Sequence, residues 1–282
     1  NPSLRKKFLL PRLRLQKPRL QPLKHKRPPV SHISYSELKN WNTCAFYHKL
    51  VNIDKLKGFK GNEFTAFGTA IHTVCEKKLL RETVSDDLFV RELQKNIADL
   101  DGVVEIDKRL VVDMMGQGKR IVPEIDDALD DYFDKYEVVS TEESLMVPIE
   151  GFDRNFKGFI DAVIKTSDGK YHIMDWKSCS WGWDAKRRSE PMTTYQLTLY
   201  KNFYAKKHGI DPKNIETHFA LLKRTAKKGS KVEIFRVTSG PRKTSSAMAL
   251  LNRAIQNIES KRCIKNRLSC KYCSFYKTEH CT

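Results

Sequence analysis

The sequence has 282 residues and a mean hydropathy of −0.55, and 40% of its residues are hydrophobic. This composition supports a sizeable buried core and excludes wholesale disorder. We find no apolar run that approaches the roughly 20 residues of a bilayer-spanning helix, so we predict no integral membrane protein. Lysine and arginine number 52 against 34 acidic residues, a formal net charge of +18. This excess predicts a polyanionic partner or a solvated tail.

Residues 1–30 are predicted to form an extended, disordered, basic arm. The first 29 residues hold ten lysines and arginines, six prolines and no acidic residue. Proline breaks helices, and the segment has little apolar surface to bury. We interpret the arm as a contact for nucleic acid, another polyanion or a protein partner. A solubilising tail or an organelle-targeting segment is the alternative.

Residues 31–282 have the pattern of one α/β domain. Residues 86–140 are rich in acids and are predicted to be a helical insertion, whereas from Leu145 onward the pattern becomes strand-like. A Cys-rich, metal-binding patch is expected at 262–282. Helices are expected over 34–50, 66–82, 86–137, 193–208 and about 243–260, and strands over 145–149, 156–164, 171–176, 217–222 and 232–237.

A predicted hairpin carries the most informative pair of residues, Asp161 and Asp175. The connection 167–169 ends in glycine and fits a three-residue loop, and that register sets Asp161 opposite Asp175. Side chains alternate along a strand, so Lys177 projects from the same face as Asp175. Two opposed carboxylates destabilise a sheet unless a cation neutralises them. We therefore predict a Mg²⁺ or Mn²⁺ site here; a two-residue loop would instead put Asp161 on the other face, leaving an ordinary charge pair.

Four short motifs occur in the order found in one nuclease family. They are Phe67-Gly68-Thr69-Ala70-Ile71-His72, Gly158-Phe159-Ile160-Asp161, Asp175-Trp176-Lys177 and Tyr195-Gln196-Leu197-Thr198-Leu199-Tyr200. Jointly they resemble the motifs of the PD-(D/E)XK nuclease superfamily, specifically its RecB-type exonuclease branch. The resemblance implies a restriction-endonuclease-like central mixed sheet flanked by helices. It also implies metal-dependent cleavage of phosphodiester bonds, usually in DNA.

The resemblance also implies roles for individual residues. An acidic position before the first strand of relatives could match Glu142, but Glu143 beside it makes the alignment ambiguous, and neither is included in the predicted site. Aromatic residues near the active strand could stack on unpaired bases, with core packing as the alternative; these are Trp181, Trp183 and Tyr195. The implied catalytic residues are Asp161, Asp175, Lys177, Gln196 and Tyr200, and the implied Mg²⁺ or Mn²⁺ ligands are His72, Asp161 and Asp175.

Cysteines predict a second metal site. A C-x₂-C pair places two thiolates on one turn, which is typical of zinc and iron–sulfur sites. The chain resembles the iron–sulfur members of the RecB-type branch, the AddB-type and CRISPR-adaptation exonucleases, although Ala45 and the long gap before Cys281 depart from them. The resemblance implies a [4Fe-4S] cluster on Cys44, Cys270, Cys273 and Cys281. Zn²⁺ is the alternative, on Cys263, Cys270, Cys273 and Cys281, with His280 as a further rival ligand.

These features together predict a metal-dependent DNA nuclease. We expect an exonuclease or end-processing enzyme of replication, recombination or repair, which acts on DNA that is single-stranded or has free ends. The alternative is a non-catalytic nucleic-acid-binding protein on a degenerate nuclease fold with a structural metal. The seven cysteines without a secretory signal indicate an intracellular, reducing compartment.

Overall fold

The computed structural model describes residues 31–85 and 87–282, and the arm predicted for residues 1–30 lies outside them. The strands are β1 (Ser31–Ser34), β2 (Tyr136–Pro148), β3 (Arg154–Thr166), β4 (Tyr171–Cys179), β5 (Ile215–Lys223) and β6 (Val232–Val237). The α-helices are α1 (Tyr35–Thr43), α2 (Ala45–His48), α3 (Glu63–Leu79), α4 (Leu88–Ala98), α5 (Lys108–Ile121), α6 (Glu124–Phe133), α7 (Ala185–Ser189), α8 (Pro191–His208) and α9 (Pro241–Glu259). Shorter helical turns are η1 (Lys49–Ile53), η2 (Pro212–Asn214) and η3 (Arg267–Tyr272).

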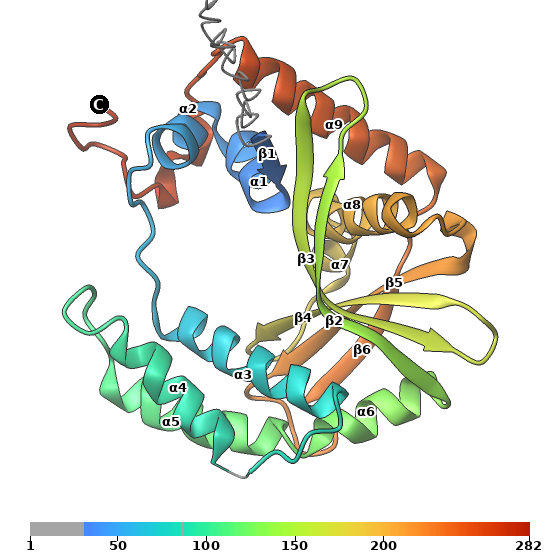
Figure 1. Cartoon of the computed structure of the whole chain (residues 1–282). Helices are drawn as coiled ribbons and strands as arrows, with labels where there is room; N and C mark the ends of the chain where they lie inside the picture. Colours follow the sequence, from blue (N-terminus) through green and yellow to red (C-terminus); the bar gives the residue numbers. More distant parts are fainter. Residues whose placement is uncertain (1–30, 86) are drawn as a thin grey trace, which may run out of the picture. The chain divides into compact units, whose positions relative to one another are not determined.

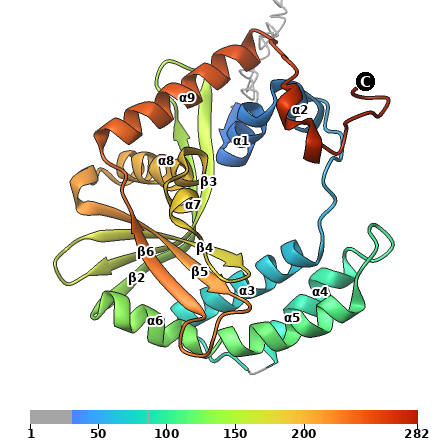
Figure 2. The same ribbon diagram turned by 180° about the vertical axis from the view of Figure 1, so that it is seen from behind.

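A mixed sheet is the centre of the described chain. Its six strands within the described residues follow the order β1-β3-β4-β5-β6, and β2 pairs with β3 outside this path. Helices α8 and α9 lie on one side of the sheet, while α3 and α6 lie on the other (Figures 1 and 2). The expected α/β fold, a central mixed sheet flanked by helices, is therefore confirmed.

The central strands bury side chains on both faces. In β4, Ile173 packs into the core beneath α8 and α9, and its neighbour Met174 packs into the core beneath α3 and α6. Phe219 and Ala220 of β5 divide in the same way. Because both faces are covered, these strands are continuous apolar runs, and polar residues within them are exceptions that need an explanation.

Strand β3 has an interrupted edge. The antiparallel partner β2 follows it from 155 to 166 and occupies one of its two edges. The other edge is shared by β1, parallel over 154–157, and β4, antiparallel over 162–165. Among the described residues, no strand therefore pairs with residues 158–161 on that edge. Polar side chains can enter the sheet at this gap.

The largest differences from the predicted element boundaries occur at two places. The helix expected over 34–50 is interrupted at Cys44, whose extended backbone (φ −164°, ψ 116°) separates α1 from α2. The helical prediction for 86–137, and the insertion drawn to 140, are wrong at their ends because β2 begins at Tyr136. Residues 136–140 contain adjacent valines, and β-branched residues favour a strand over a helix.

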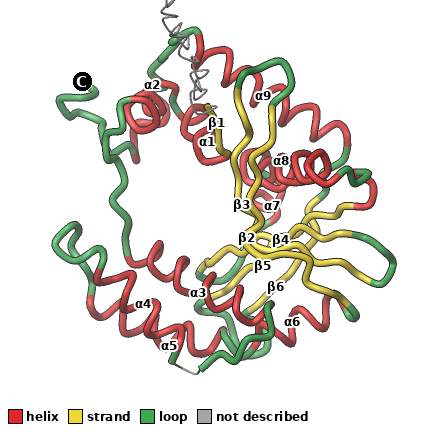
Figure 3. The backbone as a smooth tube through the Cα atoms, viewed as in Figure 1, coloured by secondary structure: helices red, strands yellow, loops and turns green. Residues whose placement is uncertain are grey.

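The segment 54–62, which joins η1 to α3, contains neither helix nor strand (Figure 3). In the described part of the chain, no helix combines the length and the apolar character that crossing a membrane requires.

Candidate functional site

The β3–β4 hairpin brings Asp161 and Asp175 to the same level of neighbouring strands. Its loop has Gly169 in the left-handed conformation (φ 82°), as the three-residue loop predicts. The ladder pairs residues 165 to 162 with residues 171 to 174 and ends at Ala162 and Met174. The next positions in this register are Asp161 and Asp175. They lie where β3 loses its partner on this edge. Asp175 contacts Gln196 of α8, and Asp161 lies near His72 of α3.

Asp161 is fixed by hydrogen bonding and by helix α3. Its Oδ2 accepts a hydrogen bond from the backbone N–H of Trp176 at 2.7 Å and lies 3.6 Å from Nδ1 of His72. Burial, together with the negative charge of Asp175, raises the pKa of Asp161 well above its ordinary value, although Lys177 opposes this. Burial lowers the pKa of His72, so the imidazole is neutral at pH 7 and has a free lone pair.

Asp175 is almost fully buried and is contacted by two long side chains. Nε2 of Gln196 donates to Oδ1 of Asp175 at 2.8 Å and also lies 3.3 Å from the hydroxyl of Tyr200. The ammonium group of Lys177 forms an ion pair with Oδ2. Helix α8 thus presents Gln196 and Tyr200, four residues apart, to the carboxylate on β4.

Tyr200 also explains a glycine in the second motif. A Cβ atom on Gly158 would lie 2.8 Å from the Tyr200 ring, closer than real Cβ contacts allow. The ring, which is 6% exposed, therefore closes over the backbone of β3 at the unpaired edge. Burial raises the pKa of Tyr200, so its hydroxyl remains protonated at neutral pH.

Helix α3 positions His72 through its cap and its apolar side. Asn62 caps the helix by accepting from the N–H of Thr65 at 3.1 Å, and the Thr65 hydroxyl accepts from the N–H of Asn62 at 2.9 Å. Phe67 and Ile71 are fully buried against the sheet. His72 follows at the border of this buried side, where its side chain is 30% exposed and reaches Asp161.

Strand β2 adds a carboxylate that the sequence left undecided. Residues 141 and 143 pair with 162 and 160, so Glu142 stands opposite Asp161. Its backbone is left-handed (φ 47°), which is strained for a residue with a side chain inside a strand. Burial and the charges of Glu76 and Asp175 raise the pKa of Glu142. Glu142 therefore borders the site, and a backbone conformation of this kind leaves no signal in the sequence.

Its neighbour Glu143 has a different role. The Glu143 carboxylate forms an ion pair with Lys207 at 2.7 Å and a hydrogen bond with Nε2 of His208 at 2.8 Å, both at the end of α8. These contacts attach β2 to α8, so Glu143 is a structural residue.

The three predicted aromatic residues differ in exposure. Trp181 is 79% exposed. Trp183 is 7% exposed, and its ring lies 5.0 Å from Phe219 and 6.2 Å from Phe235, measured between centroids. Tyr195 is half-buried against the same core. The expectation that Trp183 stacks on bases is therefore wrong, because this indole is part of the core beneath α8 and α9.

His72, Asp161, Asp175, Lys177, Gln196 and Tyr200 are called the carboxylate cluster below. Its four motifs lie within the part of the chain that matches a family model. The model of the PD-(D/E)XK nuclease superfamily matches residues 32–278. The chain belongs to this superfamily.

Solved structures are similar to this nuclease-superfamily chain at low sequence identity. A protein from Eubacterium rectale, described as "Putative exonuclease", is 14% identical over 86% of each chain, with a TM-score of 0.57. Another protein, SSO0001, is 12% identical over 90% of this chain and 87% of its own, with a TM-score of 0.41. The first similarity shows a shared fold. No curated protein matches the chain.

The four cysteines predicted as cluster ligands line one cavity of about 400 Å³ in this superfamily member. All seven cysteines are free thiols. The rival ligands Cys263 and His280 are not among the residues that line the cavity. The cysteines that do line it are Cys44, Cys270, Cys273 and Cys281.

Hydrogen bonds join the two distant parts of the chain that form this cavity. Sγ of Cys44 accepts from the N–H of Asn266 at 3.3 Å, and the side-chain amide of Asn266 donates to the carbonyl of Thr43 at 2.9 Å. The N–H of Phe46 donates to the carbonyl of Ile264 at 3.3 Å. The interruption between α1 and α2 therefore exposes Cys44 to the segment that carries the other three cysteines.

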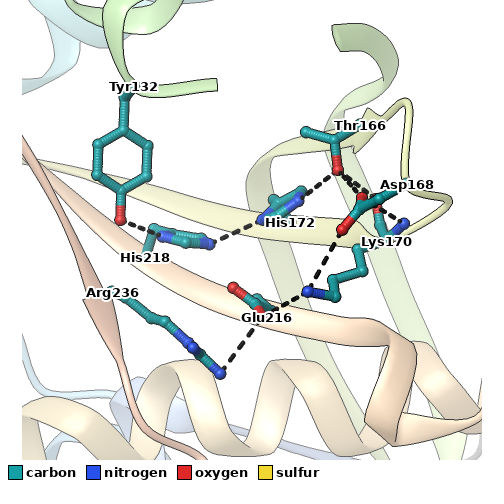
Figure 4. Close-up of polar contacts among 8 residues, drawn as sticks. All are labelled: Tyr132, Thr166, Asp168, Lys170, His172, Glu216, His218 and Arg236. Carbon is teal, nitrogen blue, oxygen red and sulfur yellow. Dashed lines mark hydrogen bonds and ion pairs between the residues drawn. The ribbon is translucent and has the colours of Figure 1, made fainter. Parts of the chain in front are cut away.

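A further group of side chains was missed by the sequence analysis. Tyr132, Thr166, His172, Glu216 and His218, called the histidine cluster below, meet between β4, β5 and α6 (Figure 4). Ligand atoms of His172, Glu216 and His218 all lie within 4.8 Å of one another. Over residues 31–85 and 87–282, no three cysteines are that close, nor are His72, Asp161 and Asp175.

A chain of hydrogen bonds satisfies the histidine cluster. The Tyr132 hydroxyl lies 3.2 Å from Nδ1 of His218, and Nε2 of His218 lies 3.0 Å from Nδ1 of His172. Nε2 of His172 lies 2.9 Å from the hydroxyl of Thr166, which donates to Asp168 at 2.6 Å. One direction of donation, from tyrosine to aspartate, gives every ring nitrogen a partner while both rings stay neutral.

Charges around the histidine cluster are also paired. Glu216 forms ion pairs with Lys170 at 3.5 Å and Arg236 at 3.3 Å. Burial lowers the pKa of His218 to about 3 and also lowers the pKa of His172. The cluster arises because β5 pairs in parallel with β4, and this long-range register has no signature in residue spacing.

Proposed function

We propose that this chain is a divalent-metal-dependent nuclease that hydrolyses phosphodiester bonds in DNA. It acts as an exonuclease or end-processing enzyme in replication, recombination or repair. The observation that carries the proposal is the placement of Asp161 and Asp175 at matching positions of neighbouring strands, with the ammonium group of Lys177 on Asp175. Membership of the PD-(D/E)XK superfamily supports it.

The donor set fits a hard divalent cation. Asp161 and Asp175 offer carboxylate oxygens, and the neutral imidazole of His72 offers a nitrogen. The two neighbouring carboxylates are a concentration of negative charge that a cation would offset. His72, Asp161 and Asp175 would therefore hold Mg²⁺ or Mn²⁺. Such an ion polarises a phosphate oxygen and lowers the pKa of a bound water.

The other residues of the carboxylate cluster orient and balance these donors. Gln196 fixes the rotamer of Asp175 through the 2.8 Å hydrogen bond, and Tyr200 supports Gln196 from the same helix face. The N–H of Trp176 holds Asp161. Lys177 places a positive charge where a phosphate would gain negative charge during hydrolysis.

The proposed substrate is DNA that is single-stranded or has free ends. The exposed indole of Trp181, two residues beyond β4, supports stacking on an unpaired base. The net charge of +18 supports salt-sensitive attraction to the phosphate backbone. The basic residues of the arm add to this attraction or contact a protein partner.

The proposal is tested by incubating the purified full chain with end-labelled single-stranded and double-stranded DNA. Mg²⁺, Mn²⁺ and EDTA are compared, and each reaction is repeated with Asp175→Asn, Lys177→Ala and the distant control Lys213→Ala. We expect cleavage with the metals by wild type and Lys213→Ala only. Equal cleavage by all variants would reveal contamination or another site, and DNA binding without product would indicate a non-catalytic binding protein.

We also propose a [4Fe-4S] cluster on Cys44, Cys270, Cys273 and Cys281. Four thiols around one cavity are a fitting donor set. Tetrahedral Zn²⁺, with Zn–S bonds near 2.3 Å, would hold its sulfurs about 3.8 Å apart. No three described cysteine sulfurs are within 4.8 Å of one another, so a single Zn²⁺ would require the thiols to move together, and Zn²⁺ is the alternative that the test distinguishes.

The cofactor proposal is tested with protein purified without oxygen. A brown sample with a broad visible absorption band, and iron and sulfide in equal amounts, would support the cluster. Cys270→Ser should lose the colour, while Cys263→Ser, the matched control outside the cavity, should keep it. A colourless protein that carries one zinc would contradict the proposal.

A further inference from the structure

A hollow of about 330 Å³ adjoins the carboxylate cluster. Lys177 and Gln196 of the cluster line it, together with Lys39 from α1 and Arg187 from α7. Three of its lining residues are cationic, and Glu190 is its acidic residue. The hollow is therefore a positively charged extension of the site in which hydrolysis is proposed.

The carboxylate of Glu190 is already hydrogen-bonded within the protein. Its carboxylate caps helix α8, because it accepts hydrogen bonds from the backbone N–H groups of Met192 and Thr193. Among the described residues, Lys39 and Arg187 form no ion pair with this or any other carboxylate. Two cations at the hollow thus remain open to an incoming anion.

The adjacent arginines Arg187 and Arg188 differ in whether a carboxylate of the protein pairs with them. Arg188 donates to Glu233 at 2.6 Å and to the carbonyl of Trp183 at 2.9 Å, so its charge is paired within the protein. The Arg187 guanidinium lies over the Trp183 ring, with its Cζ 4.6 Å from the ring centroid. This cation–π contact holds the group in place without neutralising its charge, so its N–H donors can bind a phosphate.

Arg187 also borders a second hollow that contains Trp181. The two hollows share Trp183 and Arg187, so Arg187 stands between Lys177 on one side and Trp181 on the other. Trp181 is 79% exposed, although an indole of this size usually contacts other apolar groups. The order Lys177, Arg187, Trp181 is the order in which a strand leaving the site would meet them.

We propose that Lys39 and Arg187 bind the backbone phosphate next to the one that is hydrolysed, and that Trp181 stacks on the following base. The inference rests on the proposed function and specifies its substrate as an unpaired strand. A base in a duplex is covered by its neighbours and cannot stack on the indole, whereas every unpaired base has a free face.

The test uses the full chain with Asp175→Asn, so that DNA is bound without being cut. Binding of a fluorescent single-stranded oligonucleotide is measured by anisotropy over a range of salt concentrations, in the presence of Mg²⁺. Lys39→Gln, Arg187→Gln and Trp181→Ala are each added to this parent, and Lys213→Gln, an exposed lysine before β5, is the matched charge control. The four positions changed in this parent are all exposed, so we expect each variant to fold as the parent does.

We expect two different signatures. Lys39→Gln and Arg187→Gln should weaken binding several-fold and lower the slope of log affinity against log salt by about 0.7 for the lost phosphate contact. Trp181→Ala should weaken binding about tenfold without a change in that slope, and should leave the affinity for a blunt duplex unchanged. Lys213→Gln should bind as the parent does.

Two results would overturn the inference. If Lys39→Gln and Arg187→Gln match the parent in affinity and slope while wild type still cleaves DNA, the subsite is wrong and the proposed function survives. If the parent binds no DNA and wild type cleaves none, the proposed function and the subsite both fail.

Discussion

Strand β4 carries two polar groups with opposite properties. His172 belongs to the histidine cluster and Asp175, three residues later, to the carboxylate cluster, on the other face of the sheet. In the histidine cluster, every ring nitrogen has a hydrogen-bond partner and the nearby carboxylates are paired with cations (Figure 4). In the carboxylate cluster, two acids lie near each other and Lys177 offsets only part of their charge.

This difference separates groups that stabilise the fold from groups that act on a ligand. A buried network in which every hydrogen-bond donor and acceptor has a partner makes the structure rigid. It leaves no free donor or acceptor to bind another molecule. A buried pair of like charges costs stability and is retained where a ligand makes use of it. The close spacing of His172, Glu216 and His218 thus has a structural explanation, while the site of chemistry is proposed at the carboxylate cluster.

The largest expected effect is on catalysis. Asp161→Asn keeps an oxygen that accepts from the N–H of Trp176 but removes the negative charge. We expect kcat on DNA to fall about a thousandfold, because the carboxylate contributes several kcal/mol through the metal. The melting temperature should stay or rise, since a like charge has been removed. An active variant, or one that melts well below wild type, would remove the proposed distinction between the clusters.

The next effect is on stability. His218→Ala leaves a cavity and deprives Tyr132 and His172 of a hydrogen-bond partner. We expect the free energy of unfolding in urea to fall by about 2–4 kcal/mol while kcat stays within about twofold. His208→Ala, which removes an exposed histidine from α8, is the control and should cost under about 1 kcal/mol. A large loss of kcat in folded His218→Ala would place the histidine cluster in the active machinery.

A third effect concerns pH. Burial lowers the pKa of His218 to about 3 and that of His172 below its ordinary value, so the folded protein holds both neutral. The unfolded chain protonates them near pH 6.5. The contribution of these neutral histidines to the free energy of unfolding should therefore be fully present above about pH 7. As the pH decreases below about 6.5, the free energy of unfolding should decrease by up to about 1.4 kcal/mol per pH unit for each histidine. Urea titrations over this range should show a shallower fall for His218→Phe; equal slopes would contradict the assignment.

The smallest expected effect tests the direction of hydrogen-bond donation within the histidine cluster. Thr166→Val removes the hydroxyl that accepts from His172 and donates to Asp168. We expect a loss of about 1 kcal/mol in the free energy of unfolding. Thr73→Val, on the surface of α3, is the control and should change stability little. An unchanged stability in Thr166→Val would mean that His172 bonds to water instead.

Local patterns were sufficient to predict the hairpin and its register. A three-residue loop that ends in glycine fixes which residues face each other, so the neighbouring positions of Asp161 and Asp175 follow from the sequence. Residues four apart on a helix share a face whatever surrounds them, so Gln196 and Tyr200 were placed together as well.

Contacts that depend on distant parts of the chain were beyond such patterns. The histidine cluster needs the parallel register of β4 and β5, which are separated by α8. The burial of Trp183 depends on Phe235 from β6, although Trp181 has the same residue type and stays exposed. The position of Glu142 depends on its left-handed backbone conformation, which a glutamate in the sequence does not predict.

The interrupted edge of β3 has a consequence for how the chain can vary. Because β1 and β4 share that edge, the length of the interval 158–161 fixes the spacing between the residues of β3 that pair with β1 and those that pair with β4. One residue added or deleted there would turn Asp161 to the opposite side of the sheet. Otherwise it would shift β1 and α1 by one residue along β3. We expect natural length changes to accumulate in the turn at 149–153, and this short interval to tolerate none.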